Sequence, residues 1–320
     1  MSTGGGKKAI VAALAANLGI AVSKFVAFLL SGSASMLAES LHSVADSGNQ
    51  GLLLLGGRRA RRSATAEHPF GYGRDRYFYA FVVSVVLFTL GGLFALYEGY
   101  EKIRHPHELA EWYWPIGVLL VAIVMESFSL RTAVIESNQV RGSQSWVEFV
   151  RRAKAPELPV VLLEDLAALI GLMLALAGVS LAALTGNPLW DGVGSMSIGA
   201  LLVVIAVILA AETKSMLIGE AATRSDIAKI EAALRAEPGV RRIIHMRTMH
   251  LGPDELLVAA KFAIRRWDSA ADVANTINTA EGRIREAVPI ARVIYLEPDF
   301  QEMERADADV EAAGPLTRSD

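Results

Sequence analysis

Three ionisable residues, Glu39, His42 and Asp46, lie in a stretch of the chain that is otherwise apolar enough to cross a bilayer. Their spacings of three and four residues place the side chains on one face of a helix. A charged side chain inside hydrocarbon is costly unless it is paired, hydrated or bound to a ligand. A neutral imidazole and a carboxylate suit Zn²⁺ or a similar divalent ion, and both must be deprotonated to bind it. The pattern favours metal binding coupled to proton movement over a purely structural hydrogen-bonded pair.

A second acidic cluster, Glu164 and Asp165, lies in the apolar segment 160–171. Neighbouring residues on a helix point about 100° apart, so the two carboxylates cannot face one partner equally. If this segment crosses the membrane, Asp165 reaches the same depth as Asp46. The sequence therefore predicts one metal site between the two segments. The second acid is then either a further ligand or the partner of an arginine or a backbone group.

Other polar residues in the apolar segments allow two interpretations each. Lys24 and Glu39 fall in the same half of two neighbouring segments, so they form an ion pair, or Glu39 acts as a ligand or proton relay. Asn17 lies deep in the first segment. It either joins helices by a hydrogen bond, which is the commoner role of asparagine in a membrane, or acts as a ligand or relay.

The composition is that of a polytopic membrane protein. Hydrophobic residues make up 52% of the 320 residues, and the mean hydropathy is +0.36. Because the chain has no cysteine, a metal must be held by histidine, carboxylate or carbonyl groups, and disulfides are excluded. We expect no resident cofactor. No basic patch with interleaved aromatic residues is present, so nucleic acid is not an expected partner.

Six apolar stretches are each long enough to cross roughly 30 Å of hydrocarbon as helices. They cover approximately 9–30, 36–57, 77–100, 113–136, 158–184 and 192–218. The connections 58–76 and 137–157 are rich in arginine, and the other connections carry little positive charge. The positive-inside rule then predicts that both termini are cytoplasmic. Because no transit peptide is evident, we expect a multi-pass protein of a bacterial cell membrane.

The remainder of the chain has the pattern of a small soluble domain. Helical spacing at 225–236 is followed by predicted strands at 240–249 and 256–264, a helix at 269–287 and a strand at 291–296. The predicted fold is an α-helical membrane protein with six transmembrane helices, residues 1–218, followed by a cytoplasmic α+β domain of order α-β-β-α-β, residues 219–300. Residues 301–320 are acidic and predicted to be disordered.

The arrangement resembles the cation diffusion facilitator family of divalent-metal/proton antiporters over most of the chain. The resemblance rests on the segments 32–46, 68–74 and 212–220 together with the six spans and the trailing domain. It implies a secondary active transporter rather than an enzyme. Such a protein exports zinc as a homodimer by alternating access, with divalent metal ions, protons and the lipid bilayer as its partners.

The family's transport site takes two residues, four apart, from each of the second and fifth helices. His42, Asp46 and Asp165 match these positions, but Val161 stands where the fourth ligand is expected. The resemblance leaves three alternatives: Glu164 supplies the fourth ligand, as in a subgroup with an adjacent Glu-Asp pair, or water completes a three-residue site, or Asn17 or Glu39 contributes. Loss of a nitrogen ligand favours Mn²⁺ or Fe²⁺ as the alternative cargo. A non-transporting membrane metal sensor or scaffold is the rival from a different class.

The family's accessory metal positions are incomplete in this sequence. His68 is present in the second connection, with Thr65 and Tyr72 where an acid and a histidine are expected. In the C-terminal domain His245 matches one position and most of the others do not. We therefore expect a dimerisation domain that binds little or no metal, although His245, His250 and Glu297 could form a weak site.

Overall fold

The computed structural model describes residues 4–31, 34–106 and 113–300. Some side chains within the first two helices, and that at position 114, lie outside the described set; among them are those of Lys24, Glu39, His42 and Asp46. The chain divides into two compact units, Met1–Ile218 and Gly219–Asp320. Each unit is described by itself.

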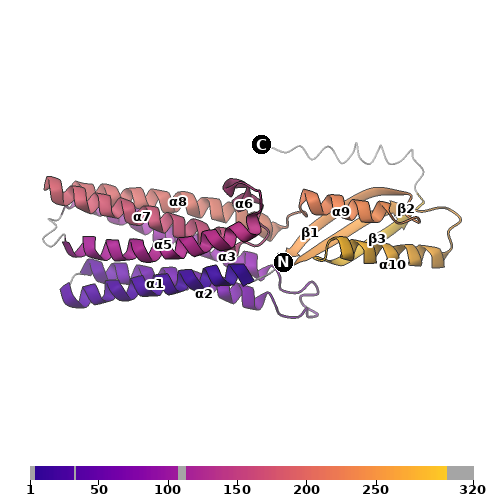
Figure 1. Cartoon of the computed structure of the whole chain (residues 1–320), viewed down its shortest axis with the longest axis horizontal. Helices are drawn as coiled ribbons and strands as arrows, with labels where there is room; N and C mark the ends of the chain where they lie inside the picture. Colours follow the sequence, from indigo (N-terminus) through magenta and orange to yellow (C-terminus); the bar gives the residue numbers. More distant parts are fainter. Residues whose placement is uncertain (1–3, 32–33, 107–112, 301–320) are drawn as a thin grey trace. The chain divides into compact units, whose positions relative to one another are not determined.

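The first unit contains six long helical segments among its described residues (Figure 1). The first two are α1 (Gly4–Ser31) and α2 (Ala34–Arg59). The third is continuous through α3 (Asp75–Val86), the π-helix η1 (Leu87–Leu93) and α4 (Phe94–Arg104). The others are α5 (Tyr113–Arg141), α7 (Glu157–Thr185) and α8 (Leu189–Ile218). The six predicted apolar stretches are therefore all helical.

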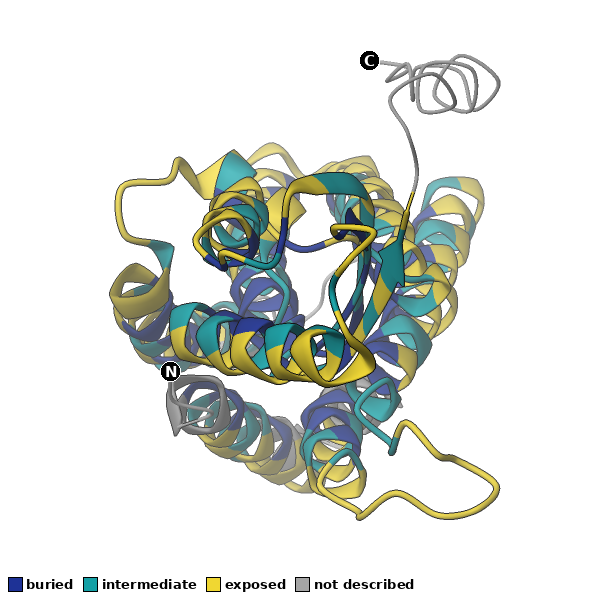
Figure 2. Cartoon of the chain, turned by 90° about the vertical axis from the view of Figure 1, so that its right-hand side faces the viewer, coloured by how far each residue is buried: buried dark blue, intermediate teal, exposed yellow. Residues whose placement is uncertain are grey.

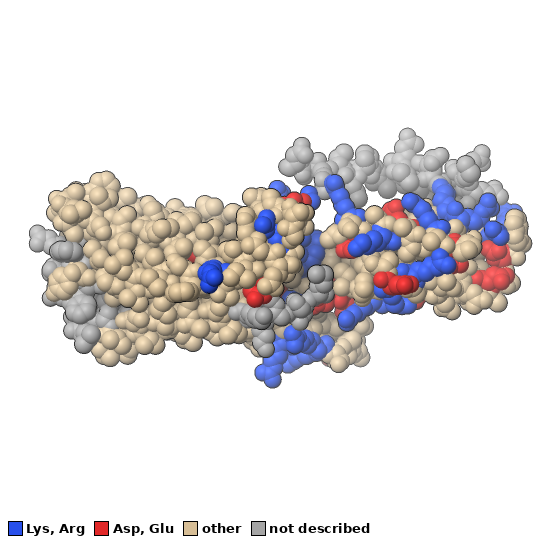
Figure 3. Space-filling view, in the orientation of Figure 1, with Lys and Arg blue, Asp and Glu red and all other residues tan. Residues whose placement is uncertain are grey.

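Four segments of the described chain are long and apolar enough to cross a membrane, namely Asp75–Arg104, Pro115–Arg141, Glu157–Thr185 and Leu189–Ile218. A shorter apolar helix covers Ala9–Ser23 within α1. Buried residues lie on the sides of the helices that face one another, and exposed residues cover the outside (Figure 2). Few charged side chains appear on the visible side of this bundle in Figure 3. An apolar outer surface is what lipid requires, whereas water favours a charged one.

The order of packing places α7 in the centre of the bundle. It contacts α5 and α8 extensively and also α1, while α2 packs against α1 and α3. Buried Val160, Val161 and Leu162 of α7 belong to the main apolar cluster together with Leu209 of α8. The acidic pair that follows these residues is therefore held inside the bundle and not on its lipid-facing surface.

The connection at 137–157 is partly helical, and this helix was not predicted from the sequence. Helix α6 covers Trp146–Arg152. Its N-cap is Ser145, whose side chain accepts a hydrogen bond of 3.1 Å from the backbone N–H of Glu148. Ser145 and Glu148 have the spacing of a capping box, so this short helix could have been recognised from its cap.

The second unit has the predicted order α-β-β-α-β. It consists of α9 (Arg224–Arg235), β1 (Arg242–Gly252), β2 (Glu255–Ala263), α10 (Ala270–Ala287) and β3 (Ala291–Asp299). β2 is the central strand, antiparallel to β1 and parallel to β3. Ile230 and Ile284 of the two helices pack with Val258 of β2 in a buried cluster. Both helices therefore cover the same face of the sheet.

Candidate functional site

A cavity of about 280 Å³ lies among the helices of the first unit. α7 contributes a long wall, which runs from Glu164 and Asp165 to Val179. The other polar residues that line the cavity come from five further helical segments: Asn17, Ser43, Glu98, Lys102, Glu126, Asp191 and Ser195. Carboxylates along an internal cavity can bind and pass cations without exposing them to lipid.

Asp165 is held on one side by α5. Its side chain is buried, and Oδ2 accepts a hydrogen bond of 2.7 Å from Oγ of Ser129. Ser129 is itself buried on α5. A carboxylate oriented by a fixed hydroxyl has the support that metal-binding carboxylates usually receive from their neighbours.

Glu164 is held on the other side by α2. Its Oε1 accepts 2.9 Å from Nδ2 of Asn49, and its Oε2 accepts 3.1 Å from Nε2 of Gln50. Gln50 in turn accepts a hydrogen bond of 3.3 Å from Nδ2 of Asn17 on α1. The two adjacent acids thus turn toward different helices, as the helical rotation of about 100° per residue requires.

Asn17 therefore makes the interhelical hydrogen bond that is one of its two predicted roles, and it also lines the cavity. Val161 lies one turn before Asp165 and is fully buried in the apolar core. The position that lacks a ligand in the sequence thus serves packing. No group of three or more His, Asp or Glu side chains able to hold a metal occurs among the side chains that are described.

The predicted residues on α2 can be located only by their backbone. His42, Asp46 and Glu39 lie on α2, and Lys24 lies on α1, but these four side chains fall outside the described set. The structure therefore brings together Asn17, Glu164 and Asp165 of the predicted residues, and leaves the other four untested.

Sequence reasoning missed the polar residues that orient the acids, which are Asn49, Gln50 and Ser129, and it missed Ser43, which lines the cavity. A signal for two of them was present. Asn49 and Gln50 follow Asp46 by three and four residues, so they continue the same helical face. Ser129 carried no such signal, because a serine in a membrane helix more often bonds to its own backbone, as Ser127 does to Ile123.

The loop that carries His68 is closed by direct contacts. The backbones of Thr65 and His68 exchange hydrogen bonds of 3.1 and 3.2 Å. The Thr65 hydroxyl lies 3.3 Å from the Tyr72 hydroxyl, and the rings of His68 and Tyr72 meet edge to face. The residues that replace the expected metal ligands thus bond to one another.

The weak site suggested in the C-terminal domain is wrong. His245 and His250 are five residues apart on β1, so they point to opposite faces of the sheet. His245 is exposed, whereas His250 is buried with Nδ1 3.3 Å from the carbonyl oxygen of Gly252. Glu297 forms an ion pair of 3.1 Å with Lys261. The three side chains form no cluster.

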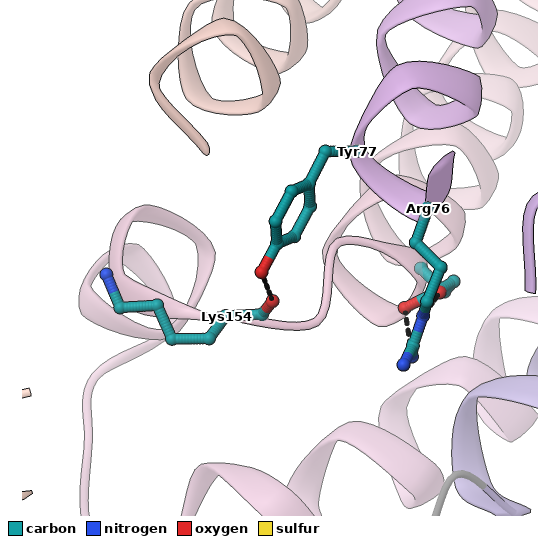
Figure 4. A network of polar contacts seen from close by, with 4 residues as sticks. Arg76, Tyr77 and Lys154 are labelled. Atoms are coloured by element: carbon teal, nitrogen blue, oxygen red, sulfur yellow. Dashed lines mark hydrogen bonds and ion pairs between the residues drawn. The ribbon is translucent and has the colours of Figure 1, made fainter. Parts of the chain in front are cut away.

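Buried polar contacts join the ends of the third segment and α7 (Figure 4). Nη2 of Arg76 donates 2.9 Å to Oε2 of Glu157, and Nε of Arg76 pairs with Oε1 of the same carboxylate. The Tyr77 hydroxyl donates 3.1 Å to the carbonyl oxygen of Lys154. We call this the arginine-rich end of the bundle, because Arg58, Arg59, Arg61, Arg62, Arg151 and Arg152 also belong to helix ends and connections there.

The fold and the cavity define the class, which is a polytopic helical membrane protein with acidic residues enclosed between its helices. Residues 10–218 match the family model described as the cation efflux transmembrane domain. The chain therefore belongs to the cation efflux family, as its resemblance to the cation diffusion facilitators predicts.

Curated relatives agree with this family. The chain is 32% identical over 72% of its length to the protein of Mus musculus named proton-coupled zinc antiporter SLC30A9, mitochondrial, and covers 41% of that protein. It is 29% identical over 77% of its length to metal tolerance protein C4 of Arabidopsis thaliana, covering 54% of it. It is 25% identical over 89% of its length to magnetosome protein MamB of Paramagnetospirillum magneticum, covering 90% of it. The chain thus spans about two fifths to half of the length of the first two relatives.

Proposed function

We propose that the chain is a secondary active transporter that exports a divalent metal cation, with zinc as the principal cargo, in exchange for protons. The observation that carries the proposal is the cavity among the helices, with the buried Glu164 and Asp165 on its wall. An enclosed carboxylate either binds a cation or takes up a proton, so a cavity of this kind suits coupled exchange of the two. The names of the SLC30A9 relatives, which state proton-coupled zinc antiport, support the choice of cargo.

The proposed metal site is formed by His42 and Asp46 of α2 and by Asp165 of α7, with Glu164 as the fourth ligand. The register of α2 supports this. Ser43 lines the cavity and Gln50 binds Glu164. Position 46 lies three residues after Ser43 and four residues before Gln50, so it falls on the same face of α2 between them. Position 42 precedes position 46 by one turn on that face.

The transport cycle follows from the chemistry of these ligands. In the state that faces the source compartment, a neutral His42 and ionised carboxylates take up the metal. In the state that faces the other compartment, protons compete for the same groups and displace it. The protonated carrier then returns, so export of metal is driven by the inward proton gradient.

The cargo has one alternative of the same class. Hydroxyl and amide groups surround the two acids, and Val161 provides no nitrogen ligand. A site dominated by oxygen favours Mn²⁺ or Fe²⁺ more than a site with two histidines does. A competition assay, in which each of these ions is added in excess during zinc transport by the purified protein, distinguishes the cargoes.

We further propose a homodimer in a cell membrane, with the arginine-rich end and both termini in the cytoplasm. The positive-inside rule supports the orientation. An exposed Tyr295 on the sheet face opposite the helices of the C-terminal unit supports a surface for self-association. Light scattering of the purified protein measures its mass, and labelling of single cysteines introduced at each end of the bundle tests the orientation.

Transport into inverted membrane vesicles tests the proposed function. Asp46→Ala and Asp165→Ala should each abolish zinc uptake while the protein remains folded and inserted. Glu148→Ala is the matched control, because this carboxylate lies on α6 outside the cavity. Uptake at the wild-type rate in both Asp46→Ala and Asp165→Ala would contradict the proposal.

A further inference from the structure

Lys102 near the end of α4 holds three polar groups around its ammonium. Its Nζ lies 3.1 Å from Oδ2 of Asp191 and 3.2 Å from Oε1 of Glu98. It also donates a hydrogen bond of 3.2 Å to Oγ of Ser195. We call these four residues the Lys102 cluster. They lie at the end of the bundle opposite the arginine-rich end.

Close packing of two helix backbones fixes the position of this cluster. A Cβ added at Gly99 of α4 would lie 2.6 Å from the backbone nitrogen of Met196 on α8. A Cβ added at Gly192 of α8 would lie 3.1 Å from the backbone nitrogen of Ile103 on α4. Larger residues at these positions would separate the helices. The two glycines therefore bring Lys102 and Asp191 within reach of each other.

All four members of the Lys102 cluster line the same cavity as Glu164 and Asp165. Along α7 the cavity wall runs from Asp165 to Val179. These residues are about 21 Å apart at the helical rise of 1.5 Å per residue. A cation that leaves Asp165 along this cavity therefore meets the Lys102 cluster before it reaches the end of the bundle.

We propose that Lys102 is a fixed counter-ion that prevents Glu98 and Asp191 from trapping the departing metal ion. The inference rests on the proposed export function. Two carboxylates and a hydroxyl are hard oxygen ligands that hold divalent cations, and together they carry two negative charges. The ammonium occupies the position between them and leaves the cluster with one net negative charge. Cations are still attracted to this end of the cavity, but they are released from it.

A purely structural role, in which Lys102 only ties α4 to α8, makes a different prediction. In that case the loss of Lys102 lowers the melting temperature, which Asp191→Asn restores as it would for any buried ion pair, but no additional zinc is bound. If Lys102 acts through its charge, neutralising Asp191 as well must restore the balance. The test therefore compares Lys102→Met, which keeps the aliphatic stem, with the double variant Lys102→Met/Asp191→Asn.

The first arm measures zinc binding by equilibrium dialysis of the purified full-length protein with zinc chloride, in an Asp165→Asn background that weakens the proposed transport site. Lys102→Met should add about one bound zinc per chain. The double variant with Asp191→Asn should lose it again. Arg104→Met is the control, because Arg104 is a neighbouring cation on α4 that does not line the cavity; it should add none.

The second arm measures zinc transport in proteoliposomes with Asp165 intact. Lys102→Met should slow turnover about fivefold through slower release, and the double variant should recover most of the rate. If Lys102→Met does not give folded protein, Lys102→Gln is carried through both arms. The proposal is overturned if the lysine variant binds no extra zinc, if its turnover is unchanged, or if the double variant is as slow as the single one. A wild-type protein that moves no zinc contradicts the export function instead, and the dialysis arm still reports on Lys102.

Discussion

Asn49 and Glu164 are separated by 115 residues, and Nδ2 of Asn49 donates a hydrogen bond of 2.9 Å to Oε1 of Glu164. This contact joins α2 to α7, which are the two helices that carry the proposed metal ligands. Gln50 makes a second such contact from the next position of α2. The relative position of the two helices is therefore set by hydrogen bonds within about one turn of Asp46 and next to Asp165.

Replacement of Asn49 by leucine should destabilise the protein by about 1.5–3 kcal/mol, the range for a hydrogen bond to a charged group. Oδ1 of Asn49 has no hydrogen-bond partner among the described residues, so only the bond to Glu164 is lost. The melting temperature in detergent measures the change. Gln139→Leu, at an exposed position of α5, is the control and should leave the melting temperature close to that of the wild type. An Asn49→Leu protein as stable as the control would contradict the role assigned to this bond.

Replacement of Ser129 by alanine should lower the affinity for zinc without unfolding the protein. The hydroxyl orients Asp165, and loss of such a partner typically reduces metal affinity or activity about 10–100-fold. The KM for zinc in proteoliposomes measures the effect. Ser127→Ala is the matched control, because its hydroxyl bonds to the backbone of its own helix. Equal KM values for the two variants would show that Ser129 does not position Asp165 for metal.

Removal of Arg76 should be among the most destabilising single changes in the helical unit. The side chains of Arg76 and Glu157 are 12% and 7% exposed, so Arg76→Met leaves a buried carboxylate without its cation. Such a change costs about 3–5 kcal/mol, whereas replacement of both partners by apolar residues is often nearly neutral. The melting temperature should therefore fall in Arg76→Met and recover in Arg76→Met/Glu157→Leu.

The control for this pair is Arg152→Met. Arg152 pairs with Glu148 on α6, where the two side chains are 58% and 37% exposed. An exposed pair contributes at most about 1 kcal/mol. A larger loss of stability in Arg152→Met than in Arg76→Met would contradict the assignment of the buried pair.

Acid should weaken the edge of the sheet in the C-terminal unit. Lys261 donates to Asp299 over 2.9 Å, which lowers the pKa of Asp299 and raises the pKa of Lys261. A carboxylate whose pKa is lowered by folding stabilises the fold above its unfolded pKa of about 3.9. This contribution is lost as the pH falls through the lower folded pKa, and the Lys261 contribution persists until the pH rises above about 10.4.

Hydrogen exchange of the β3 amides in the full chain measures this effect. Protection should fall in the wild type as the pH drops below about 4, after correction for the intrinsic exchange rate. In Asp299→Asn protection should be reduced already at neutral pH and should depend less on acid. Glu286→Gln, at an exposed position of α10, is the control and should follow the wild type. An unchanged acid dependence in Asp299→Asn would contradict the assignment.

The helices were predictable because their apolar lengths are constrained by the bilayer. The strand order was predictable as well, since helical and alternating patterns follow one another after Ile218. The π-helix at Leu87–Leu93 was not, because its apolar residues read as ordinary helix. Its Gly92 closely approaches the backbone of Val203 on α8, a tertiary contact that no local pattern encodes.

The candidate site was predictable in its acids and not in their partners. Glu164 and Asp165 stand out because carboxylates are rare in apolar segments. Glu164 accepts hydrogen bonds from α2, and Asp165 accepts one from α5. Which acid bonds to which helix depends on the helices that flank α7. That arrangement follows from packing across the bundle. The Lys102 cluster was missed for the same reason, because Glu98 and Asp191 come together only when α4 meets α8.

Simultaneous recording of zinc and protons tests the central claim most directly. The purified full-length protein is reconstituted in liposomes that contain a zinc indicator and a pH indicator, and a zinc gradient is imposed. The account predicts that zinc moves down its gradient while protons move the opposite way, and that Asp165→Asn abolishes both fluxes. Zinc movement without proton movement, or both fluxes at the wild-type rate in Asp165→Asn, would contradict it.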